Sequence, residues 1–437
     1  MRKPGSRRRS GQGAEAMKEL SPSDSQRPDL AACRAALSQT RYLLLSLVPF
    51  HRDATGRVWV DRLWHRDLMT HLTYLSDLTV LAAEYPDRPA DGDLVEAVAP
   101  DGVRLNFRRL CTVPRRGRDM LTALPRMVAA ARSALRQADV VHSGVGGWPL
   151  PPGMILNPLA LAQRKPVVIV VESAFWRIPP SQAAGSKHRA IAAANESFAR
   201  WSLRHARFAV YTHEGYRATL PPGPRTRAAV IPASWISASD ILDPPAAEAA
   251  WQAKPVPVRF LFASRLVRQK GAEGVLDALT LLDRRGLEIH VDVIGEGDLV
   301  PAFRQLQPRL RNIRLQVLDP VPYGAPFRRI LDNVHAVLVP TTGDEQPRII
   351  YDAFARAVPV IASDTPGNLS LVAEGHNGLI FPAGNAAAMA ERLALAAADG
   401  EGLRRMGMAG IATGRAHTHE AMHLARARIL AELFGRP

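Results

Sequence analysis

The chain has 437 residues, more than one compact hydrophobic core usually holds, so we expect two domains of about 200 residues each. Apolar residues make up 47% and charged residues 22%, which is typical of a soluble globular protein and excludes a disordered or membrane-spanning chain. The excess of 56 Lys and Arg over 41 Asp and Glu gives a net charge of +15 and favours anionic partners.

The first residues and the cysteines indicate a cytoplasmic protein. Residues 1–36 are expected to form a disordered basic tail, because MRKPGSRRRSGQG is followed by a polar stretch instead of the apolar core of a signal peptide. Cys33 and Cys111 have neither a disulfide pattern nor metal-ligand spacing, so no metal site is predicted. No apolar run approaches the ~20 residues that cross a bilayer.

The first half alternates apolar runs with helical stretches. YLLLSLVPF (42–50) predicts a strand, HRDATGR a polar loop, and residues 65–78 a helix. Further strands are expected within 139–147, 166–176, 206–215 and 228–234. Their near-continuous Val and Ile runs indicate strands buried on both faces of a parallel sheet. The alternation predicts a doubly wound α/β domain, Rossmann-like, over residues 37–240.

The second half repeats this pattern after a Pro- and Ala-rich break at about 237–258, where we place the domain boundary. Strands are expected at 259–264, 288–295, 312–318, 335–340 and 377–382, with a further helix and strand within 347–363. Helices are expected from Gly271, near Leu299, and at 326–332 and 386–398. A second Rossmann-like domain over 241–415 follows, and a helix within 416–437 is expected to pack back at the domain junction.

Polar clusters follow four strands of the second domain. They are 264–271, 295–297, 343–348 and 364–367. Because the carboxyl ends of parallel strands share one edge of the sheet, the clusters are expected to converge there, where ligands of such sheets bind. Glycine and charge at each exit favour a phosphate-bearing ligand over ordinary turn chemistry.

Two of these clusters suit a diphosphate. Arg265 and Lys270 could bring a planar guanidinium and a point charge to one anion, although a solvated loop pair would show the same spacing. Gly295 and Gly297 would allow the backbone to approach a ligand closely, but glycines of this kind also mark plain tight turns.

Carboxylates surround the helix that we expect to begin near Pro347. Asp344 and Glu345 lie in the loop before it, and Asp352 lies more than a turn inside it. A carboxylate at Asp352 could accept two hydrogen bonds from vicinal hydroxyls such as those of a ribose. Complementarity to the helix N-terminus would explain Asp344 and Glu345, but it would not explain Asp352.

Three stretches carry a resemblance to a known family: RFLFASRLVRQKGAEGVLDAL, VDVIGEGD and AVLVPTTGDEQPRIIYDAFARAVPVIASDTPGNLSLVAEGHNGLIFPAGNAAAMAERL. This half resembles the C-terminal domain of family 4 glycosyltransferases, retaining enzymes with the two-Rossmann-domain GT-B fold. The likeness covers about residues 257–400, while the first half matches only in its βα layout.

The resemblance implies roles for individual residues. Arg265 and Lys270 match the diphosphate-binding pair of the family, and Gly295 and Gly297 match its glycine turn. The two family glutamates, seven residues apart, fall on Asp344 and Asp352. Both side chains are one methylene shorter here, which moves the carboxylate by about 1.5 Å. The adjacent and longer Glu345 could take over the role of Asp344.

The implied reaction is transfer of a sugar from a nucleotide-diphosphate sugar to a hydroxyl of a glycan or lipid-linked glycan, with retention at the anomeric carbon. Arg265 and Lys270 would stabilise the departing diphosphate, together with the helix N-termini at Pro347, Arg348 and Gly367, and no metal or cofactor is demanded.

The contribution of the first domain is less defined. In many family members a histidine at a strand exit contacts the sugar, whereas the comparable exit here has Glu172 and Ser173. His142 and His213 are also expected to follow strands. Glu172 and His142 join Asp344 and Glu345 as candidate catalytic residues, with loop polarity or a satisfied core histidine as the alternative.

A run of arginines in the first half suggests a second partner. It comprises Arg104, Arg108, Arg109, Arg115, Arg116 and Arg118. Beside apolar neighbours, this run could dock on an anionic bilayer at the inner face of the membrane, although a solvated charge run remains an alternative. Aromatic residues are only 6% of the chain, so nucleic-acid binding is not expected.

Two other functions keep the same fold. One is a sugar-nucleotide epimerase, and the other is a non-catalytic glycosyltransferase-like subunit, which the shortened carboxylates at Asp344 and Asp352 keep open. The sequence does not identify the donor sugar, its base, the acceptor or the oligomeric state.

Overall fold

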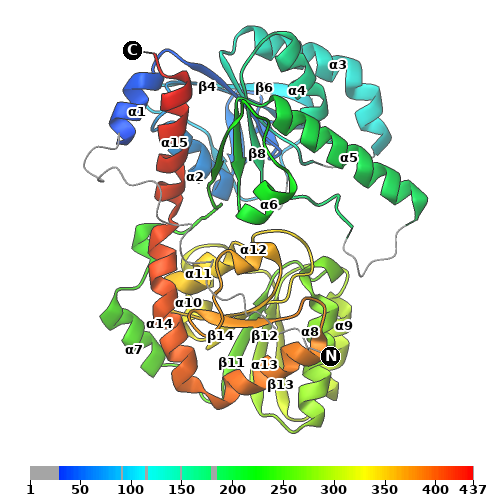
Figure 1. The fold of residues 1–437 in the computed structure, drawn as a ribbon, viewed down its shortest axis with the longest axis vertical. Helices are drawn as coiled ribbons and strands as arrows, with labels where there is room; N and C mark the ends of the chain where they lie inside the picture. Colours follow the sequence, from blue (N-terminus) through cyan, green and yellow to red (C-terminus); the bar gives the residue numbers. More distant parts are fainter. Residues whose placement is uncertain (1–28, 90–91, 114–116, 148–149, 179–184, 437) are drawn as a thin grey trace, which may run out of the picture.

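The computed structural model describes residues 29–89, 92–113, 117–147, 150–178 and 185–436. They form two α/β domains, one above the other in Figure 1. The chain passes from the first domain to the second between β10 (Arg227–Val230) and α7 (Pro244–Gln252). It returns between α14 (Gly400–Ala416) and α15 (His419–Phe434).

The N-terminal domain is built on a single sheet. Within the described residues it has ten strands in the order β10-β9-β8-β7-β1-β4-β2-β3-β5, and β6 also pairs with β4. The others are β1 (Arg41–Leu45), β2 (Phe50–Arg52), β3 (Val58–Asp61), β4 (Asp77–Tyr85), β5 (Leu94–Glu96), β6 (Arg104–Thr112), β7 (Val140–Gly144), β8 (Val167–Val171) and β9 (Phe208–Tyr211). Only the pairings of β3 with β2 and β5 are antiparallel.

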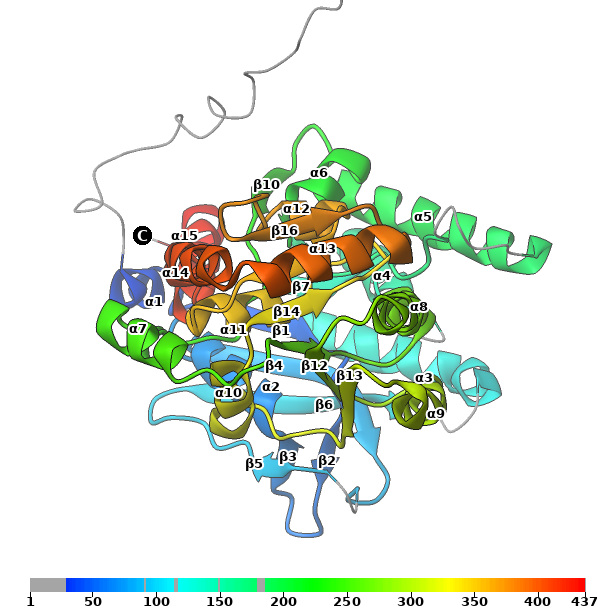
Figure 2. The same ribbon diagram turned by 90° about the horizontal axis from the view of Figure 1, so that it is seen from below.

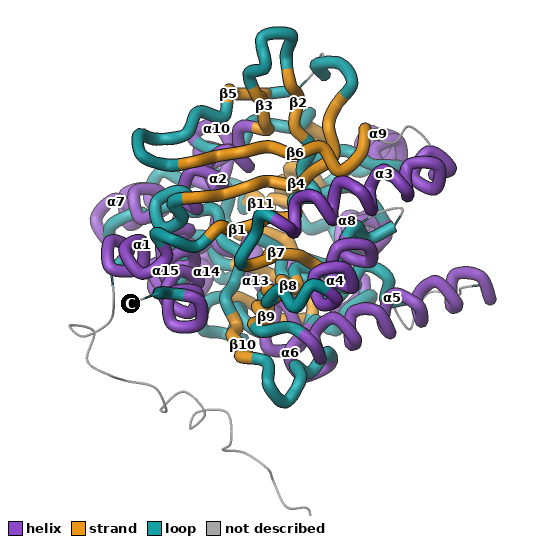
Figure 3. The backbone as a smooth tube through the Cα atoms, turned by 90° about the horizontal axis from the view of Figure 1, so that it is seen from above, coloured by secondary structure: helices purple, strands orange, loops and turns teal. Residues whose placement is uncertain are grey.

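Helices cover both faces of this sheet (Figure 3). They are α1 (Leu30–Leu37), α2 (Arg62–His71), α3 (Gly117–Arg136), α4 (Gly153–Ala162), α5 (Ser186–His205) and α6 (Glu214–Thr219). Successive strand residues point to opposite faces. Val140 and Val168 therefore pack with α1, α2 and α15, whereas Val141 and Ile169 pack with α3, α4 and α5.

The C-terminal domain has six parallel strands in the order β13-β12-β11-β14-β15-β16 among the residues described. They are β11 (Arg259–Ala263), β12 (Ile289–Ile294), β13 (Ile313–Leu318), β14 (Ala336–Val339), β15 (Val360–Ser363) and β16 (Gly378–Phe381). The helices, which flank the sheet in Figure 2, are α8 (Ala272–Arg284), α9 (Val300–Leu306), α10 (Ala325–Asp332), α11 (Ile349–Ala355), α12 (Pro366–Leu369) and α13 (Ala386–Ala398). This is the second Rossmann-like domain expected from the sequence.

Glycines allow α14 to lie directly on α11. A Cβ atom added to Gly407 would lie 1.9 Å from the backbone oxygen of Ala357, and one on Gly410 would lie 2.5 Å from Phe354 Cδ1. Because real Cβ atoms do not approach other atoms so closely, only glycine permits this contact. The close packing carries the chain past α11 toward its return to the first domain.

α15 completes the N-terminal domain. Its residues Met422, Ala427 and Leu430 are buried in the core beneath α1 and α2. On α1, Cys33 and Leu37 are fully buried in the same core.

The expected disordered tail is therefore wrong for its last residues. Residues 1–28 lie outside the described part of the chain, but residues 30–36 belong to α1. Asp29 caps this helix by accepting a hydrogen bond from the backbone N–H of Ala32 at 2.8 Å. Packing against α15, nearly 400 positions later, orders the segment, and local sequence carries no signal of this contact.

The helix expected through residue 78 is also too long. α2 ends at His71, and the following DLTVLAAEY forms β4. Such a Leu, Val and Ala run suits either structure, and pairing with β1 and β6 on both sides decides it here. Of the expected polar loop at 51–57, residues 53–57 form the turn of the β2–β3 hairpin, whereas His51 and Arg52 belong to β2.

The arginine run lies partly on β6. Arg104 and Arg109 come within 3.4 Å and 3.7 Å of carboxylate oxygens of Asp77 and Glu84 on β4, so part of the positive charge is balanced locally. Arg115, Arg116 and the side chain of Arg118 lie outside the described part of the chain. In the part that the structure describes, every helix is too short or too polar to span a bilayer.

The contact between α14 and α11 can be tested by substitution. Gly407→Ala is expected to lower the free energy of unfolding by about 1–3 kcal/mol, as overpacking does, because its Cβ would meet the oxygen of Ala357. Denaturant unfolding measures the change. Gly400→Ala in the same helix is the control, because a Cβ there meets nothing within 4 Å. Equal losses in the two variants would contradict the packing described.

Candidate active site at the domain junction

The strand exits of the C-terminal domain face the N-terminal domain (Figure 1). The loop between β14 and α11, residues 340–348, makes direct contact with the N-terminal domain. In this loop, Glu345 pairs with Ser173, which follows β8, as an isolated antiparallel bridge. Beside it, α12 lies against α6, so closely that a Cβ on Gly215 would lie 2.7 Å from Pro366 Cβ. The two domains therefore meet at this edge.

Gly295 and Gly297 hold the exits of β11 and β12 together. Both have positive φ, 146° and 150°. Added Cβ atoms would lie 1.8 Å from the backbone oxygen of Ser264 and 2.4 Å from that of Leu266. Only glycine fits at both positions because the backbone of the neighbouring loop lies so close. This packing fixes the exit loop that carries Arg265.

Lys270 and Glu345 form a half-buried ion pair. The Lys270 ammonium contacts Glu345 Oε1, and both side chains are mostly covered. The same carboxylate oxygen accepts a hydrogen bond from Thr341 Oγ1 at 3.2 Å. Arg265 is exposed at the end of β11, and no ion pair of its side chain is seen among the residues described. Of the two expected cations, one is already paired and one is available.

Asp344 points the other way, toward the N-terminal domain. Its carboxylate lies 3.5 Å from Arg177 Nη1 and 3.5 Å from His213 Nε2. Its backbone oxygen accepts a hydrogen bond from the Tyr216 hydroxyl. Adjacent acids of one loop thus face different domains.

Hydrogen bonds to other residues of the N-terminal domain hold the Arg177 guanidinium in place beside Asp344. Its guanidinium donates two hydrogen bonds of 3.1 Å to the Glu196 carboxylate on α5. It donates a third, of 2.8 Å, to Thr219 Oγ1 at the end of α6. This planar fork leaves Arg177 Nη1 directed at Asp344 with little conformational freedom.

The junction beside Asp344 contains incompletely satisfied polar atoms. Burial and, to a smaller extent, the nearby Arg177 guanidinium lower the pKa of His213 to about 4, so the imidazole is neutral at neutral pH. Burial also raises the pKa of Asp344, and the nearby Arg177 guanidinium partly offsets this. Both ring nitrogens of His213 and Asp344 Oδ1 are buried without a hydrogen-bond partner in the described structure. Such atoms are typical of a site that a ligand or water completes.

Asp352 lies on the buried side of α11, at 7% exposure. It accepts a hydrogen bond of 2.7 Å from the Tyr323 hydroxyl. Burial raises its pKa to about 6, although the Tyr323 hydrogen bond and Arg348 act to lower it. Arg348 itself stacks over the Trp235 ring, 5.2 Å from the ring centroid.

Gly367 serves the same loop from α12. A Cβ there would lie 1.9 Å from the backbone oxygen of Glu345, so glycine is required for α12 to press on the loop. α11, which Pro347 and Arg348 precede, has seven residues, and α12 has four. The helix N-termini expected to face an anion are therefore short.

His142 is not brought to this group. It lies inside β7, two residues before the strand ends, and its Nδ1 is 3.1 Å from the Tyr42 hydroxyl on the face that α2 and α15 cover. The expectation that it stands at a strand exit is wrong, because β7 extends through Gly144. Glu172 does follow β8 directly and is exposed.

Several residues at the junction were not expected from the sequence. His213 lies two residues after β9, and its position after a strand is the only signal of a role that the sequence gives. Arg177, Tyr216 and Tyr323 give no such signal, because they lie in loops or inside a short helix. Only the way the two domains dock brings Arg177 and Tyr216 to Asp344.

A cavity of about 230 Å³ opens beside the site. Its lining includes Gln269 and Thr342, which border Lys270 and the 340–348 loop, and residues of α8 and α13. Arg265, Lys270 and Asp352 do not line it. We therefore do not assign it to the ligand of the strand exits.

Residues 257–399 match the family profile described as "Glycosyl transferases group 1". The C-terminal domain is a group 1 glycosyltransferase domain. The resemblance to family 4 glycosyltransferases seen in the sequence of this half is confirmed.

Curated relatives align with about a third of this chain. The chain is 27% identical over 152 residues to the putative colanic acid biosynthesis glycosyltransferase WcaL of Salmonella typhimurium, covering 33% of this chain and 37% of that protein. It is 28% identical over 143 residues to the amylovoran biosynthesis glycosyltransferase AmsK of Erwinia amylovora, covering 31% and 34%. The matches thus span little more than a third of these relatives.

Solved structures resemble the whole chain. Sucrose-phosphate synthase from Thermosynechococcus elongatus superimposes with a TM-score of 0.66 at 17% identity, over 91% of this chain and 99% of that one. HepE of Anabaena, in complex with UDP, gives a TM-score of 0.59 at 14% identity over 90% and 100%. The glycosyltransferase domain is thus part of a two-domain GT-B fold, as expected.

The ionisation of Asp352 predicts a pH-dependent stability. Its folded pKa of about 6 lies above its ordinary value of 3.8, so the protonated carboxyl stabilises the fold at low pH and this contribution is lost as pH rises through about 6. Relative to Asp352→Asn, the native protein is expected to lose about 2–3 kcal/mol of unfolding free energy between about pH 4 and pH 7.5. Urea unfolding of both proteins across this range measures the difference. A constant difference would contradict the burial of an ionisable group.

Proposed function

We propose that the chain is a retaining glycosyltransferase that moves a sugar from a nucleotide-diphosphate sugar to a hydroxyl of a glycan or lipid-linked glycan. The observation that carries this is the arrangement at the strand exits. Lys270 and the exposed Arg265 stand on one side, and the carboxylates of Asp344, Glu345 and Asp352 surround the same edge between two Rossmann-like domains.

The cations would bind the diphosphate. In this structure the Lys270 ammonium pairs with the Glu345 carboxylate. A bound diphosphate would compete with Glu345 for this ammonium. Arg265 would add a planar fork that no carboxylate in the described structure engages. As the sugar leaves, negative charge grows on the diphosphate, and two positioned cations stabilise it without a metal ion or cofactor.

Asp352 would take the nucleoside. Its carboxylate has one oxygen bonded to the Tyr323 hydroxyl, and Tyr323 is 37% exposed, so the pair is reachable from outside. A ribose with vicinal hydroxyls could replace or extend this hydrogen bond. Ionisation near pH 6 would strengthen the carboxylate as an acceptor at neutral pH.

Asp344 and His213 would face the transferred sugar. Their unpartnered polar atoms lie within 3.5 Å of each other at the junction. Sugar hydroxyls both donate and accept, so they suit a carboxylate oxygen beside a neutral imidazole. The shorter Asp344 would then act from the N-terminal side, while Glu345 would act beside Lys270.

Relatives support this choice. The titles of the HepE structures record UDP, and one records UDP-glucose. The names of WcaL and AmsK record polysaccharide biosynthesis. A nucleotide sugar as donor and a growing surface polysaccharide as acceptor fit these relatives. Binding of the arginine run to an anionic membrane stays a prediction, as does a cytoplasmic location at its inner face.

The reaction can be tested directly. The purified protein is screened by thermal shift against UDP, GDP and ADP, and a nucleotide that binds the folded state is expected to raise the melting temperature. The matching nucleotide sugars are then offered with lipid-linked glycan acceptors, and NMR reads the anomeric configuration of the product. Inversion would overturn retention. Isomerised donor without transfer would favour an epimerase, and nucleotide binding without turnover a non-catalytic subunit.

The cation that binds the diphosphate has its own prediction. Lys270→Met is expected to weaken binding of the nucleoside diphosphate about 10–100-fold, because a hydrogen bond to a charged group contributes about 1.5–3 kcal/mol. Isothermal titration calorimetry measures the affinity. Lys187→Met removes an exposed lysine of α5 and should leave binding unchanged. An unaltered affinity in Lys270→Met would remove Lys270 from the site.

A further inference from the structure

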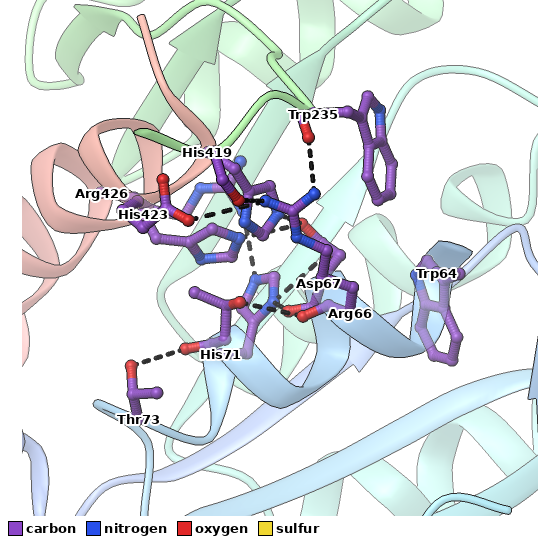
Figure 4. A network of polar contacts seen from close by, with 12 residues as sticks. Trp64, Arg66, Asp67, His71, Thr73, Trp235, His419, His423 and Arg426 are labelled. Carbon is purple, nitrogen blue, oxygen red and sulfur yellow. Dashed lines mark hydrogen bonds and ion pairs between the residues drawn. The ribbon is translucent and has the colours of Figure 1, made fainter. Parts of the chain in front are cut away.

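A cluster of histidines around one carboxylate lies between α2 and α15 (Figure 4). It is separate from the strand-exit residues described above, although Trp235 contacts both His419 and Arg348. α2 presents Asp67 and His71, and α15 presents His419 and His423, so each helix contributes a pair four residues apart. Residues at this spacing lie on one helix face. His71, His419 and His423 are almost completely buried, while the side chain of Asp67 is 18% exposed.

The potential ligand atoms of this cluster are close together. An atom from each of Asp67, His71 and His423 lies within 4.8 Å of the others. Asp67 Oδ1 is 2.9 Å from His423 Nε2 and 3.3 Å from His419 Nε2. Two ligand atoms bound to a tetrahedral zinc ion at about 2.0–2.1 Å are separated by about 3.3 Å, so these distances suit a shared metal ion.

His71 is held as a supporting residue. Arg426 Nη1, which can only donate, lies 3.1 Å from His71 Nε2, so this nitrogen accepts. The ring proton then resides on Nδ1, which donates to the backbone oxygen of Asp67 at 2.9 Å and faces its carboxylate at 3.4 Å. His71 therefore orients Asp67 and has no free lone pair for a metal ion.

His423 has the partner that a metal-binding histidine needs. Its Nδ1 lies 3.1 Å from the Tyr74 hydroxyl. When Nε2 binds a metal ion, Nδ1 carries the proton and can donate it to this hydroxyl oxygen. Metal-bound histidines commonly have such an acceptor at the second nitrogen, and it fixes the ring. His419 is held by stacking on Trp235, with ring centroids 5.6 Å apart.

We propose that Asp67, His419 and His423 bind a late first-row divalent metal ion, with Zn²⁺ as the best fit. Two imidazoles and one carboxylate match the donor preference of zinc, and the partly exposed side of Asp67 leaves a route for entry and a fourth position for water. The Arg426 guanidinium faces His71 Nε2 at 3.1 Å, and its positive charge reduces the affinity for the metal ion without occupying the site.

The ion would tie α15 to α2. The ligands come from opposite ends of the domain's sequence, because Asp67 is on the second helix and both histidines are on the last. Metal binding would therefore stabilise the docking of α15, and its binding energy would add to the folding of this domain.

The test uses the untagged full chain, freed of metal by a chelator and returned to chelator-free buffer. Co²⁺ is titrated and followed by its visible absorption, which is intense for tetrahedral sites, and Zn²⁺ is then added as competitor. One saturable equivalent is expected, displaced by Zn²⁺, and Zn²⁺ should raise the melting temperature. Asp67→Asn and His423→Gln are each expected to weaken binding at least tenfold, and Tyr74→Phe about 10–100-fold.

His376→Gln, which removes an exposed histidine, is the matched control and should bind like the native protein. If a cluster variant fails to fold by circular dichroism, X-ray absorption of the zinc-loaded native protein decides instead, through a shell containing two imidazole nitrogens. The absence of a saturable equivalent, a zinc shell without imidazole, or equal affinity in the native protein and the folded Asp67→Asn variant would overturn the proposal.

Discussion

The domain junction depends on two neighbouring acids that face opposite ways. Asp344 reaches Arg177 and His213 of the first domain, while Glu345 pairs with Lys270 of its own domain. Because successive side chains of extended backbone alternate in direction, adjacent residues of a single loop can contact the two domains. The bridge between Ser173 and Glu345 keeps the backbone extended at this point. Gly367 leaves room for the backbone of this loop at Glu345. Asp344 Oδ1 and the ring nitrogens of His213 are buried at the same junction without a hydrogen-bond partner.

The lengths of the Asp344 and Asp352 side chains fit this arrangement. At position 344, a side chain one methylene longer would press into Arg177, which Glu196 and Thr219 already hold in place. The aspartate therefore matches the distance between the domains as they are docked here. At position 352, the Tyr323 hydroxyl fills the space in front of the carboxylate. Each aspartate is matched to a neighbour from another element.

Much of the second domain was predictable, because its Val- and Ile-rich strands and glycine-marked exits are local signals. The helix at Ala386–Ala398 and the strand at Ile313–Leu318 fall where periodicity puts them. The first domain was less predictable. The first two residues of β4 fall in the expected helix until its partner strands are known, and α1 falls in the expected tail until its packing against α15 is known. Arg177 and Tyr216 could not be predicted either, because no local sequence pattern indicates a contact between domains.

The return of α15 to the first domain has a consequence during synthesis. Met422, Ala427 and Leu430 fill one side of the core beneath β1 and β7, so the amino-terminal half cannot close that core while the ribosome is still translating the carboxyl-terminal half. Although domains usually fold in order as they emerge, here the earlier one must wait for a helix made long after it. The nascent chain would expose an apolar groove throughout that interval, and chaperones that recognise such grooves would have their longest opportunity on this half.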